Sequence, residues 1–382
     1  MIPAKGFEPS LQAARRHRRI GRALADLRRG LPVVIDAGQG ALLAHAAEHL
    51  DTPALATLRE AARRDGSGQA EVRTFVTAAR AAVLHIKRTG HAVVGVRVTP
   101  DMDARTLRDL ADPATDLERP LIGPFEWLRE PPGEAALAAV KLAKLAQLLP
   151  AMVVAATEEA ADSLAGRLDL IALDPATVLA HDDHAARSLK PLGQPVRLPL
   201  HDAAQARIQA FRPADGGPEH LAVVVGNPDR QAPVLARIHS ECFTGDLLGS
   251  MRCDCGEQLR GAIRQMDAAG GGVLLYLAQE GRGIGLINKL RAYRIQDQGF
   301  DTVEANLRIG FDADERVFLP AAEMLRLLGF EAVRLLTNNP EKVAGLEACG
   351  VTVAERVPLA FAANAHNEFY LDTKRKKSGH YL

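Results

Sequence analysis

Short, continuously apolar segments alternate with amphipathic segments along most of this 382-residue chain, and this alternation constrains the fold more than any other feature. In the first half of the chain, the apolar segments predict strands and the amphipathic segments predict helices. The predicted strands are 31–36, 91–98 and 151–157, and the predicted helices are 23–30, 41–50 and 134–149. Strands that are apolar along their whole length are typical of sheets covered by helices, so this half predicts a layered α/β domain.

The second half repeats the alternation after a polar stretch, 183–218, that is rich in Pro and Gly. We interpret this stretch as the inter-domain connection together with the first strands of a second domain. The predicted strands are 221–226 and 232–241, expected to be antiparallel, then 272–278, 332–337 and 351–357, and the predicted helices are 256–271, 285–299, 321–329 and 338–350. The last helix has an Asn cap, Pro340 in its first turn and Gly350 beyond its end.

Chain length favours two domains, because 382 residues exceed what one ordinary core organises. We predict one domain at 1–200 and another at 201–382, each a mixed sheet layered with helices, in the α/β (α+β) class. The tail 366–382 is expected to be loosely structured. No internal repeat and no low-complexity tract interrupts either half.

Charge and hydropathy exclude several classes of protein. The 47 Lys and Arg residues balance the 47 Asp and Glu residues, so no overall field favours nucleic acid or a membrane as partner. No apolar stretch approaches the length of a bilayer span, and the basic segment 1–19 lacks the apolar run of a secretory signal. We therefore expect a cytoplasmic protein, in whose compartment thiols stay reduced and clustered cysteines tend to bind metal.

Three of the four cysteines lie within fourteen positions, at Cys242, Cys253 and Cys255. A disulfide would use two of them and leave one, whereas a metal ion would use all three. Thiolates are soft ligands that suit zinc, and three protein ligands leave one position for water, as in catalytic zinc sites. The alternative of three buried apolar cysteines is disfavoured because Asp254 separates two of them. Cys349, at the end of a helix, is interpreted as a packing residue.

A Gly-rich turn lies between a predicted strand and a predicted helix in the segment 277–293. The free N–H groups of such a turn, together with the helix N-terminus, suit an anionic phosphate. Glu280 and Arg282 flank Gly281 and supply an acceptor for a base or a metal and a cation for phosphate. A plain strand-to-helix connection is the alternative.

Two further segments carry charge near glycine or a helix start. The segment 301–318 places five acids and two arginines around Gly310, although a solvated loop would have the same composition. In the segment 335–342 a strand ends at Thr337 and a capped helix follows, with Lys342 in its first turns. This arrangement also suits phosphate, although Lys342 could equally be a surface lysine.

Taken together, these segments resemble GTP cyclohydrolase II of riboflavin biosynthesis. The resemblance covers about 205–382, in order, and rests on the motifs RIHSECFTGD, RCDCG, QEGRGIGL, DTVEAN and LLTNNP. It implies a hydrolase that opens the imidazole ring of GTP, releasing formate and pyrophosphate. The implied product is 2,5-diamino-6-ribosylamino-4(3H)-pyrimidinone 5′-phosphate. It also implies a homodimer with one Zn²⁺ per subunit and Mg²⁺ bound with the pyrophosphate.

The resemblance assigns roles to individual residues. It makes the three clustered cysteines the zinc ligands, Asp314 the proton acceptor, Arg316 the nucleophile at the α-phosphate, and Tyr293 a hydrogen-bonding group near the reacting ring. A guanidinium stays protonated at neutral pH, so Arg316 could instead act by stabilising charge. The implied GTP-binding residues are Arg237, Ile238, His239, Ser240, Glu241, Gln258, Glu280, Gly281, Arg282, Thr302, Thr337 and Lys342. Of these, Gln258 and Glu280 could read the Watson–Crick edge of guanine, and the cations would face the triphosphate.

The first half resembles 3,4-dihydroxy-2-butanone 4-phosphate synthase over 23–36, 118–125 and 133–157. That synthase needs an acidic loop after its first strand to hold Mg²⁺ and a sugar phosphate, but here only Asp36 precedes Glu48 in this stretch. The Gly-His-Thr-Glu stretch of the synthase has become PGEAA, without histidine. One carboxylate does not hold a divalent cation, so we predict a degenerate, inactive synthase domain.

Two other functions stay open at this point. The first is a paralogue that stops at the formylated intermediate, which the presence of Tyr293 disfavours. The second is a non-catalytic regulatory protein that binds zinc or GTP. Asp314 and Arg316 disfavour it, because a pure binder needs neither.

Overall fold

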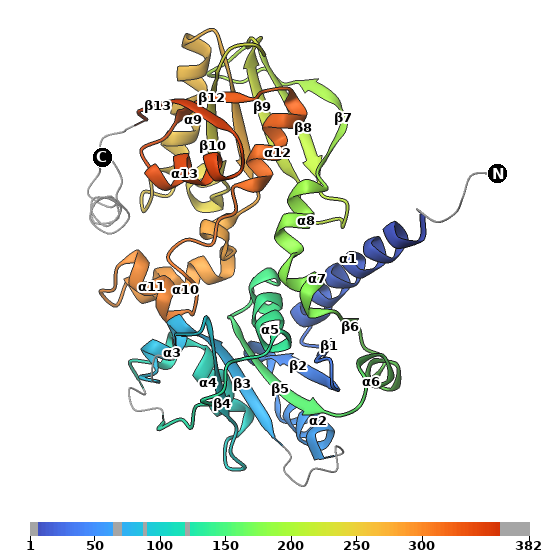
Figure 1. Ribbon diagram of the computed structural model, residues 1–382. Helices are drawn as coiled ribbons and strands as arrows, with labels where there is room; N and C mark the ends of the chain where they lie inside the picture. Colours follow the sequence, from blue (N-terminus) through green and yellow to red (C-terminus); the bar gives the residue numbers. More distant parts are fainter. Residues whose placement is uncertain (1–6, 64–70, 87–89, 119–122, 360–382) are drawn as a thin grey trace, which may run out of the picture. The chain divides into compact units, whose positions relative to one another are not determined.

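The computed structural model describes residues 7–63, 71–86, 90–118 and 123–359. The chain forms two compact units, each built around one sheet with helices packed on it (Figure 1). The first unit comprises Met1–His181, Leu290–Phe300 and Glu304–Ala313, and the second comprises Asp182–Lys289, Asp301–Val303 and Asp314–Leu382. The predicted mixed α/β class is therefore confirmed, whereas the domain boundary at residue 200 stays a prediction.

The sheet of the first unit has six strands in the order β4-β3-β5-β2-β1-β6. All neighbouring strands are antiparallel except β1 and β6, which are parallel. The strands are β1 (Val33–Asp36), β2 (Ala41–Ala46), β3 (Val72–Thr77), β4 (Val93–Arg97), β5 (Ala151–Thr157) and β6 (Ala172–Leu173).

The predicted helix at 41–50 is wrong, because residues 41–46 form β2 between β1 and β5. A tight turn makes this pairing possible, since Gly38 and Gly40 adopt positive φ angles of 78° and 85°. At Gly40 a Cβ would lie 2.0 Å from the Thr157 carbonyl oxygen, so no other residue fits there. In a short run of apolar residues that is buried on both faces, the spacing of apolar and polar residues does not distinguish a strand from a helix.

The helices of the first unit pack on this sheet around an alanine-rich core. They are α1 (Phe7–Arg28), α2 (Thr52–Arg63), α3 (Ala78–Val83), α4 (Ala104–Ala111), α5 (Glu134–Leu145), α6 (Ala161–Leu168) and α7 (Pro175–Leu179), with 3₁₀ turns η2 (Ala47–His49) and η3 (Pro113–Thr115). The small side chains of α5 are mostly buried, and they bring the helix close to the strands. The predicted helices at 23–30 and 134–149 correspond to the end of α1 and to α5.

The sheet of the second unit has seven strands in the order β13-β12-β10-β11-β9-β8-β7. They are β7 (Lys190–Arg197), β8 (Ala206–Arg212), β9 (His220–Gly226), β10 (Val234–Ser240), β11 (Gly271–Leu277), β12 (Ala332–Leu336) and β13 (Thr352–Val357). Strands β10 to β13 run parallel, and β7, β8 and β9 extend the sheet with antiparallel pairs. The strands predicted at 221–226 and 232–241 run in opposite directions but are not neighbours, because β11 lies between them.

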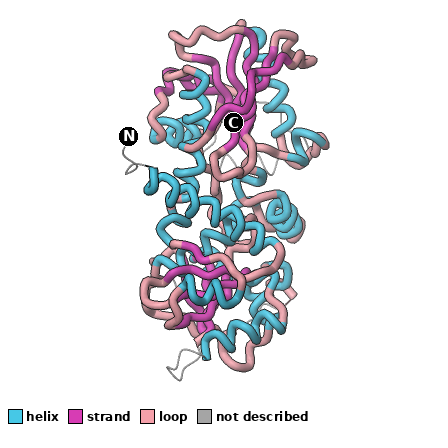
Figure 2. Tube along the Cα trace, turned by 90° about the vertical axis from the view of Figure 1, so that its right-hand side faces the viewer, coloured by secondary structure: helices cyan, strands magenta, loops and turns pink. Residues whose placement is uncertain are grey.

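The second unit contains α9 (Cys255–Ala268), α12 (Leu319–Leu328) and α13 (Pro340–Ala348), and Figure 2 shows the helices around the strands. The side chain of Asn339 caps α13 by accepting a hydrogen bond from the Glu341 N–H at 2.9 Å, as predicted. The remaining elements are α8 (His181–Arg187), α10 (Leu286–Gln296), α11 (Thr302–Arg308), the π-helical turn η4 (Phe243–Leu247) and the 3₁₀ turn η5 (Glu280–Gly283). Residues 302–308 therefore form a helix, and the predicted loose tail, 366–382, lies outside the described residues.

The parallel strands β10, β11 and β12 place the candidate site at one edge of their sheet. The strands end at Ser240, Leu277 and Leu336. The first end lies two residues before Cys242, and the other two lie at the start of the segments 277–293 and 335–342. Carboxyl ends of adjacent parallel strands open at the same edge, which is the usual ligand position in α/β sheets. None of the helices in the described part of the chain is long and apolar enough to span a membrane.

Candidate metal centre and active site

Three cysteines converge beyond the carboxyl end of β10. The Sγ atoms of Cys242, Cys253 and Cys255 lie within 4.8 Å of one another, the one such group of ligand atoms among the described residues. The Sγ atoms of Cys242 and Cys253 are 3.8 Å apart, far beyond a disulfide bond. Two thiolates on a tetrahedral zinc ion, each at about 2.3 Å, would be separated by about 3.8 Å. The three cysteines therefore fit a zinc ion.

Two glycines make the approach of the cysteines possible. A Cβ built on Gly245 would lie 2.7 Å from Cys253 Sγ and 3.1 Å from Cys242 Sγ. A Cβ built on Gly256 would lie 2.3 Å from the carbonyl oxygen of Gly245. Side chains at these positions would push the backbone away from the sulfur atoms. The turn η4 and the start of α9 are therefore shaped around the three thiols.

The surroundings favour a thiolate at Cys242. Hydrogen bonds from Cys253 and Cys255, and then the Lys289 ammonium 3.0 Å from the sulfur, hold the pKa of Cys242 far below its ordinary value. The same hydrogen bonding raises the pKa of Cys253 to about 11 and also raises the pKa of Cys255. A bound cation would remove this competition and allow all three thiols to ionise.

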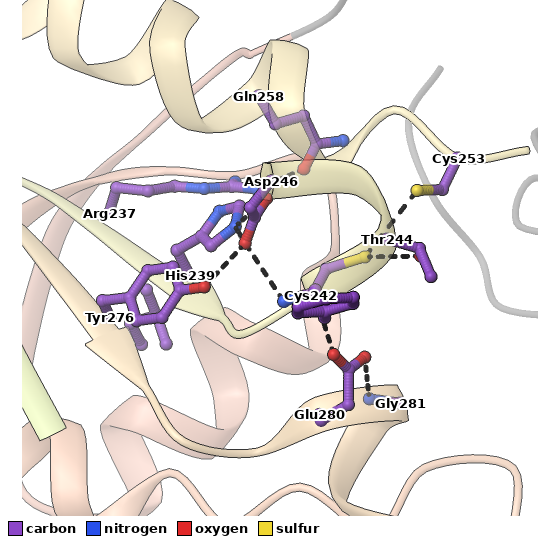
Figure 3. Close-up of polar contacts among 12 residues, drawn as sticks. Arg237, His239, Cys242, Thr244, Asp246, Cys253, Gln258, Tyr276, Glu280 and Gly281 are labelled. Carbon is purple, nitrogen blue, oxygen red and sulfur yellow. Dashed lines mark hydrogen bonds and ion pairs between the residues drawn. The ribbon is translucent and has the colours of Figure 1, made fainter. Parts of the chain in front are cut away.

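Asp246 is a buried acceptor that links the cysteine loop to the sheet (Figure 3). Its carboxylate accepts hydrogen bonds from the Cys242 N–H at 3.0 Å, the Tyr276 hydroxyl at 2.9 Å and His239 Nε2 at 3.1 Å. The His239 and Tyr276 rings stack with centroids 5.5 Å apart. Burial lowers the pKa of His239 and raises that of Tyr276, so both are neutral donors at neutral pH.

Arg237 on β10 begins a second hydrogen-bonded chain. One terminal nitrogen donates to the Leu336 carbonyl at 2.8 Å, and the other donates to Gln258, which in turn donates to Asp254. Burial lowers the pKa of Arg237 to about 10, so the guanidinium stays charged at neutral pH. Among the described residues, Arg237 Nε has no hydrogen-bond partner. A buried cation with an unused donor is suited to an oxygen of a ligand.

Glu280 lies at the end of β11 and is buried. It accepts hydrogen bonds from the N–H groups of Phe243 at 2.6 Å and Gly281 at 2.9 Å, and it forms an ion pair with Lys289 at 2.9 Å. Gly281 and Arg282 both have φ angles of 63°. A non-glycine residue in this region is strained, and such strain is typical of functional turns.

The segment after β12 turns two polar side chains into the interior. Lys342 is buried and donates to the Ile238 carbonyl at 2.8 Å, so it is not a surface lysine. The Thr337 hydroxyl is also buried and accepts from the Asn339 N–H at 3.0 Å. The burial of Lys342 excludes the alternative of a surface lysine, and its functional role stays a prediction.

Asp314 and Arg316 form a local ion pair. Arg316 Nε donates to both carboxylate oxygens of Asp314, at 2.8 and 3.0 Å, and a terminal nitrogen donates to one of them as well. Burial opposes ionisation of Asp314, but the hydrogen bonds and charge of Arg316 outweigh it and lower the pKa of the carboxyl group. Asp314 is therefore ionised at neutral pH and could accept a proton.

The other predicted site residues are divided between the two units. Ile238 is buried on β10 and Ser240 ends it, and the Ser240 hydroxyl has no partner among the described residues. Glu241 follows, and burial, then Glu280, raises its pKa. Thr302 begins α11 in the second unit, and Tyr293 lies on the part of α10 that belongs to the first unit.

Sequence reasoning did not single out Asp246, Tyr276 and Lys289, although each contacts a predicted site residue. Asp246 ends the motif RIHSECFTGD, and Lys289 lies in the segment 277–293. A carboxylate four residues after a metal-binding cysteine was a usable signal. Nothing marked Tyr276, because it is one apolar residue among several in a strand.

Fold and site together define a two-unit α/β protein whose second unit carries a three-thiol centre that could hold a metal ion. The family model described as GTP cyclohydrolase II matches residues 193–358. A GTP cyclohydrolase-2 from Azospirillum brasilense is 49% identical over 381 residues, which are 99% of this chain and 97% of that relative. A GTP cyclohydrolase-2 from Histophilus somni (strain 2336) is 56% identical over 176 residues, which are 46% of this chain and 82% of that relative.

The chain belongs to the GTP cyclohydrolase II family, because the identity to the Azospirillum brasilense relative extends over nearly all of both proteins. It is a hydrolase of riboflavin biosynthesis, and its family acts on GTP. A solved two-domain 3,4-dihydroxy-2-butanone 4-phosphate synthase from A. baumannii covers 90% of this chain and 100% of its own, at 17% identity and a TM-score of 0.34. A likeness this weak carries no argument about fold or function.

Proposed function

We propose that the second unit opens the imidazole ring of GTP hydrolytically, releasing formate and pyrophosphate and forming 2,5-diamino-6-ribosylamino-4(3H)-pyrimidinone 5′-phosphate. The observation that carries the proposal is the convergence of three cysteine sulfur atoms within 4.8 Å at the edge where β10, β11 and β12 end. Family membership supports GTP as the substrate, and the geometry of the cysteines supports chemistry at a bound metal ion. The proposed functional domains are 1–200 and 201–382.

Cys242, Cys253 and Cys255 would hold one Zn²⁺ per subunit. Their sulfur spacing, and the two glycines that make room for it, support this ligand set. When bound, zinc activates water at neutral pH, which supplies the nucleophile that opening of the guanine ring requires. The chain itself fixes the position of Cys242 through the Asp246 carboxylate and holds Lys289 against the Cys242 sulfur.

Asp314 is the proposed proton acceptor, because it is ionised and partly buried. Its bonds to Arg316 lower its basicity, so the carboxylate gains strength as a base when Arg316 turns toward the substrate. We propose that Arg316 then acts at the α-phosphate, where pyrophosphate leaves and Mg²⁺ binds with it. Tyr293 is proposed to hydrogen-bond near the reacting ring.

Ligand binding is proposed to use the polar atoms on β10 and the neighbouring strand ends. The unused donors of Arg237 and Ser240, with Lys342 and Thr337 nearby along the sheet edge, suit phosphate oxygens. Gln258 and Glu280 are proposed to read the guanine edge, which requires them to exchange their present partners. The proposed GTP-binding set also includes Ile238, His239, Glu241, Gly281, Arg282 and Thr302.

The first half of the chain is proposed to be a synthase-like domain without synthase activity. Asp36, Glu134 and Asp174 line a cavity of about 500 Å³. They do not converge, since the three cysteines form the one metal-ligand group in the described part of the chain. Asp174 also caps α7 by accepting from the Thr177 N–H at 2.9 Å, which occupies its carboxylate. We further propose a cytoplasmic homodimer that binds neither nucleic acid nor membrane.

The decisive experiment incubates the purified chain with GTP and Mg²⁺ and measures formate, pyrophosphate and the pyrimidine product together. The proposal expects all three in equal amounts. Pyrophosphate with a formylated product and no formate would indicate a paralogue that stops after ring opening. Binding of GTP without any product would indicate a regulatory protein.

A further inference from the structure

Two stretches of the chain belong to the first unit although their neighbours in sequence belong to the second. They are residues 290–300 and 304–313, here called the inserted segment. The chain leaves the second unit after Lys289, returns to it briefly at Asp301–Val303, and rejoins it at Asp314. The inserted segment carries Tyr293 and leads directly into Asp314.

The first anchor of the inserted segment is a hydrogen bond between Thr77, at the end of β3, and Gly310. The buried Thr77 hydroxyl donates to the Gly310 carbonyl oxygen at 2.6 Å. Gly310 has a φ angle of 86°, and a Cβ there would lie 2.9 Å from Pro150 Cγ and 3.2 Å from the Thr77 hydroxyl oxygen. The Gly310 backbone approaches Pro150 and Thr77 so closely that only glycine fits. This contact therefore fixes the position of the backbone at Gly310.

The second anchor is Arg80, which is 1% exposed. Its guanidinium forms a two-pronged ion pair with Asp116, with N–O distances of 2.6 and 2.8 Å. It also donates to the Arg308 carbonyl oxygen at 3.1 Å and to the Leu110 carbonyl oxygen at 2.8 Å. A buried charge is tolerated only when its donors are satisfied, so the backbone of the inserted segment is a required part of this cluster.

The third anchor is Glu48, in the turn η2. Its carboxylate accepts from the Leu149 N–H at 2.8 Å and pairs with Arg291 at 2.7 Å. Arg291 lies two residues before Tyr293. Asp312 adds a longer ion pair with Lys144, at 3.5 Å. The anchors therefore hold the inserted segment near both of its ends.

We propose that Glu48, Thr77 and Arg80 are positioning residues for GTP ring opening, because they fix the inserted segment that carries Tyr293 and ends next to Asp314. This proposal rests on the catalytic roles proposed above for Tyr293 and Asp314. Asp314 lies four positions after Gly310, so a shift of the backbone at Gly310 is transmitted to the proton acceptor over at most about 14 Å. A misplacement of about 1 Å in such a group can lower turnover about 100-fold.

The test uses the full-length protein and compares Thr77→Val with Thr77→Ser. Valine removes the hydroxyl at nearly constant shape, whereas serine keeps both the bond to Gly310 and the cap of α3. The control is Arg59→Met, because Arg59 donates to the carbonyl groups of Thr99, Pro100 and Met102 elsewhere in the same unit. Arg80→Met is less informative, since it leaves Asp116 unpaired and can unfold the unit.

For Thr77→Val we expect amide hydrogen exchange in 304–313 to be faster by roughly 5- to 10-fold, as for loss of the one hydrogen bond that the Thr77 hydroxyl makes to this stretch. We expect kcat to fall about tenfold with KM for GTP within about twofold, because the lost contact orients catalytic groups rather than GTP. Thr77→Ser should restore both values, and Arg59→Met should change neither.

Three results would overturn the proposal while leaving the proposed function intact. They are unchanged exchange in Thr77→Val, faster exchange with unchanged kcat, or an equal loss of kcat in Arg59→Met. The proposed function fails on a different result, namely wild-type protein that releases no formate from GTP. The proposal on positioning would fall with it.

Discussion

The two units carry polar groups at their sheets in different ways. In the second unit, three thiols converge within 4.8 Å, and the Asp246 carboxylate fixes the backbone of one of them. In the first unit, the acids that line the cavity near Asp36 are dispersed, and Asp174 is occupied in capping a helix. The one arginine that lines this cavity, Arg73, is paired with Glu71.

This difference shows that a cavity alone does not make a site. Ligand groups with like charges or competing protons stay together only when glycines, buried hydrogen bonds and a compensating cation hold them. The second unit supplies these at Gly245, Asp246 and Lys289. Around Asp36 the structure shows no comparable support among the described residues, so we assign the chemistry to the second unit.

The strongest test of this comparison removes one thiol. In Cys253→Ser we expect zinc to fall from about one per chain to near zero, and ring opening to be lost, because two thiolates hold zinc far less tightly than three. Metal analysis and formate release measure the two effects. Cys349→Ser is the matched control, since Cys349 packs against the core of the second unit and should keep both. A zinc-free wild-type preparation with full activity would contradict the prediction.

Removal of the proton acceptor should separate metal binding from turnover. Asp314→Asn is expected to keep zinc but lower kcat by about 100-fold or more, as for loss of a general base. Arg316→Ala should also keep zinc. If Arg316→Lys retains near wild-type turnover, a point charge is sufficient and a nucleophilic guanidinium is wrong. Loss of zinc in Asp314→Asn would show that the two functions are not separate.

Asp246 tests whether the support around the cysteines is needed. Asp246→Asn should weaken zinc binding by about 10- to 100-fold, because the Cys242 N–H, Tyr276 and His239 lose a charged acceptor. Competition with a chelator measures the affinity. Tyr276→Phe removes one donor and leaves the carboxylate, so its effect should be smaller. Equal affinities in wild type and Asp246→Asn would mean that the three thiols suffice alone.

Acid should destabilise the second unit through His220 on β9. Burial lowers the pKa of His220 from an ordinary 6.5 to about 4. The unfolded chain therefore binds more protons between these pH values, and the free energy of unfolding falls as pH decreases from about 6.5 toward 4. We expect a loss of about 2 kcal/mol between pH 7 and pH 5. Urea unfolding of His220→Asn, which keeps an acceptor for the Ala278 N–H, should show a shallower dependence. If the free energy of unfolding of His220→Asn depends on pH as steeply as that of the wild type, protonation of His220 is not the cause.

Much of the fold could be predicted from the sequence because its strands are continuous apolar runs. Strands were predicted in this way at 151–157, 272–278 and 332–337, and the structure has strands at Ala151–Thr157, Gly271–Leu277 and Ala332–Leu336. Residues 41–46 were misassigned because their pairing with β1 and β5 depends on a turn and on distant partners. The strand at Val72–Thr77 was missed, since Arg73 and two threonines interrupt its apolar character.

The candidate site was predictable where residue type and local spacing carry the chemistry. The three cysteines were found from sequence, and the structure brings their sulfur atoms together. Tyr276 could not be found, because its partner Asp246 is 30 residues away and only the sheet joins them. The anchoring of Gly310 by Thr77 spans 233 residues, a distance at which no local pattern in the sequence gives information.

The smallest effect is expected in the first unit, and it tests the other side of the comparison. The intact chain should form no dihydroxybutanone phosphate from ribulose 5-phosphate with Mg²⁺, because the carboxylates near Asp36 do not converge on a cation. The double variant Asp36→Asn, Glu134→Gln should therefore leave GTP turnover unchanged. Its free energy of unfolding should stay within about 0.5 kcal/mol of the wild-type value, as is usual for exposed positions. Magnesium-dependent conversion of ribulose 5-phosphate by the wild type that disappears in the double variant would show a working second site. In that case both units would be catalytic, and they would differ in the substrate on which they act.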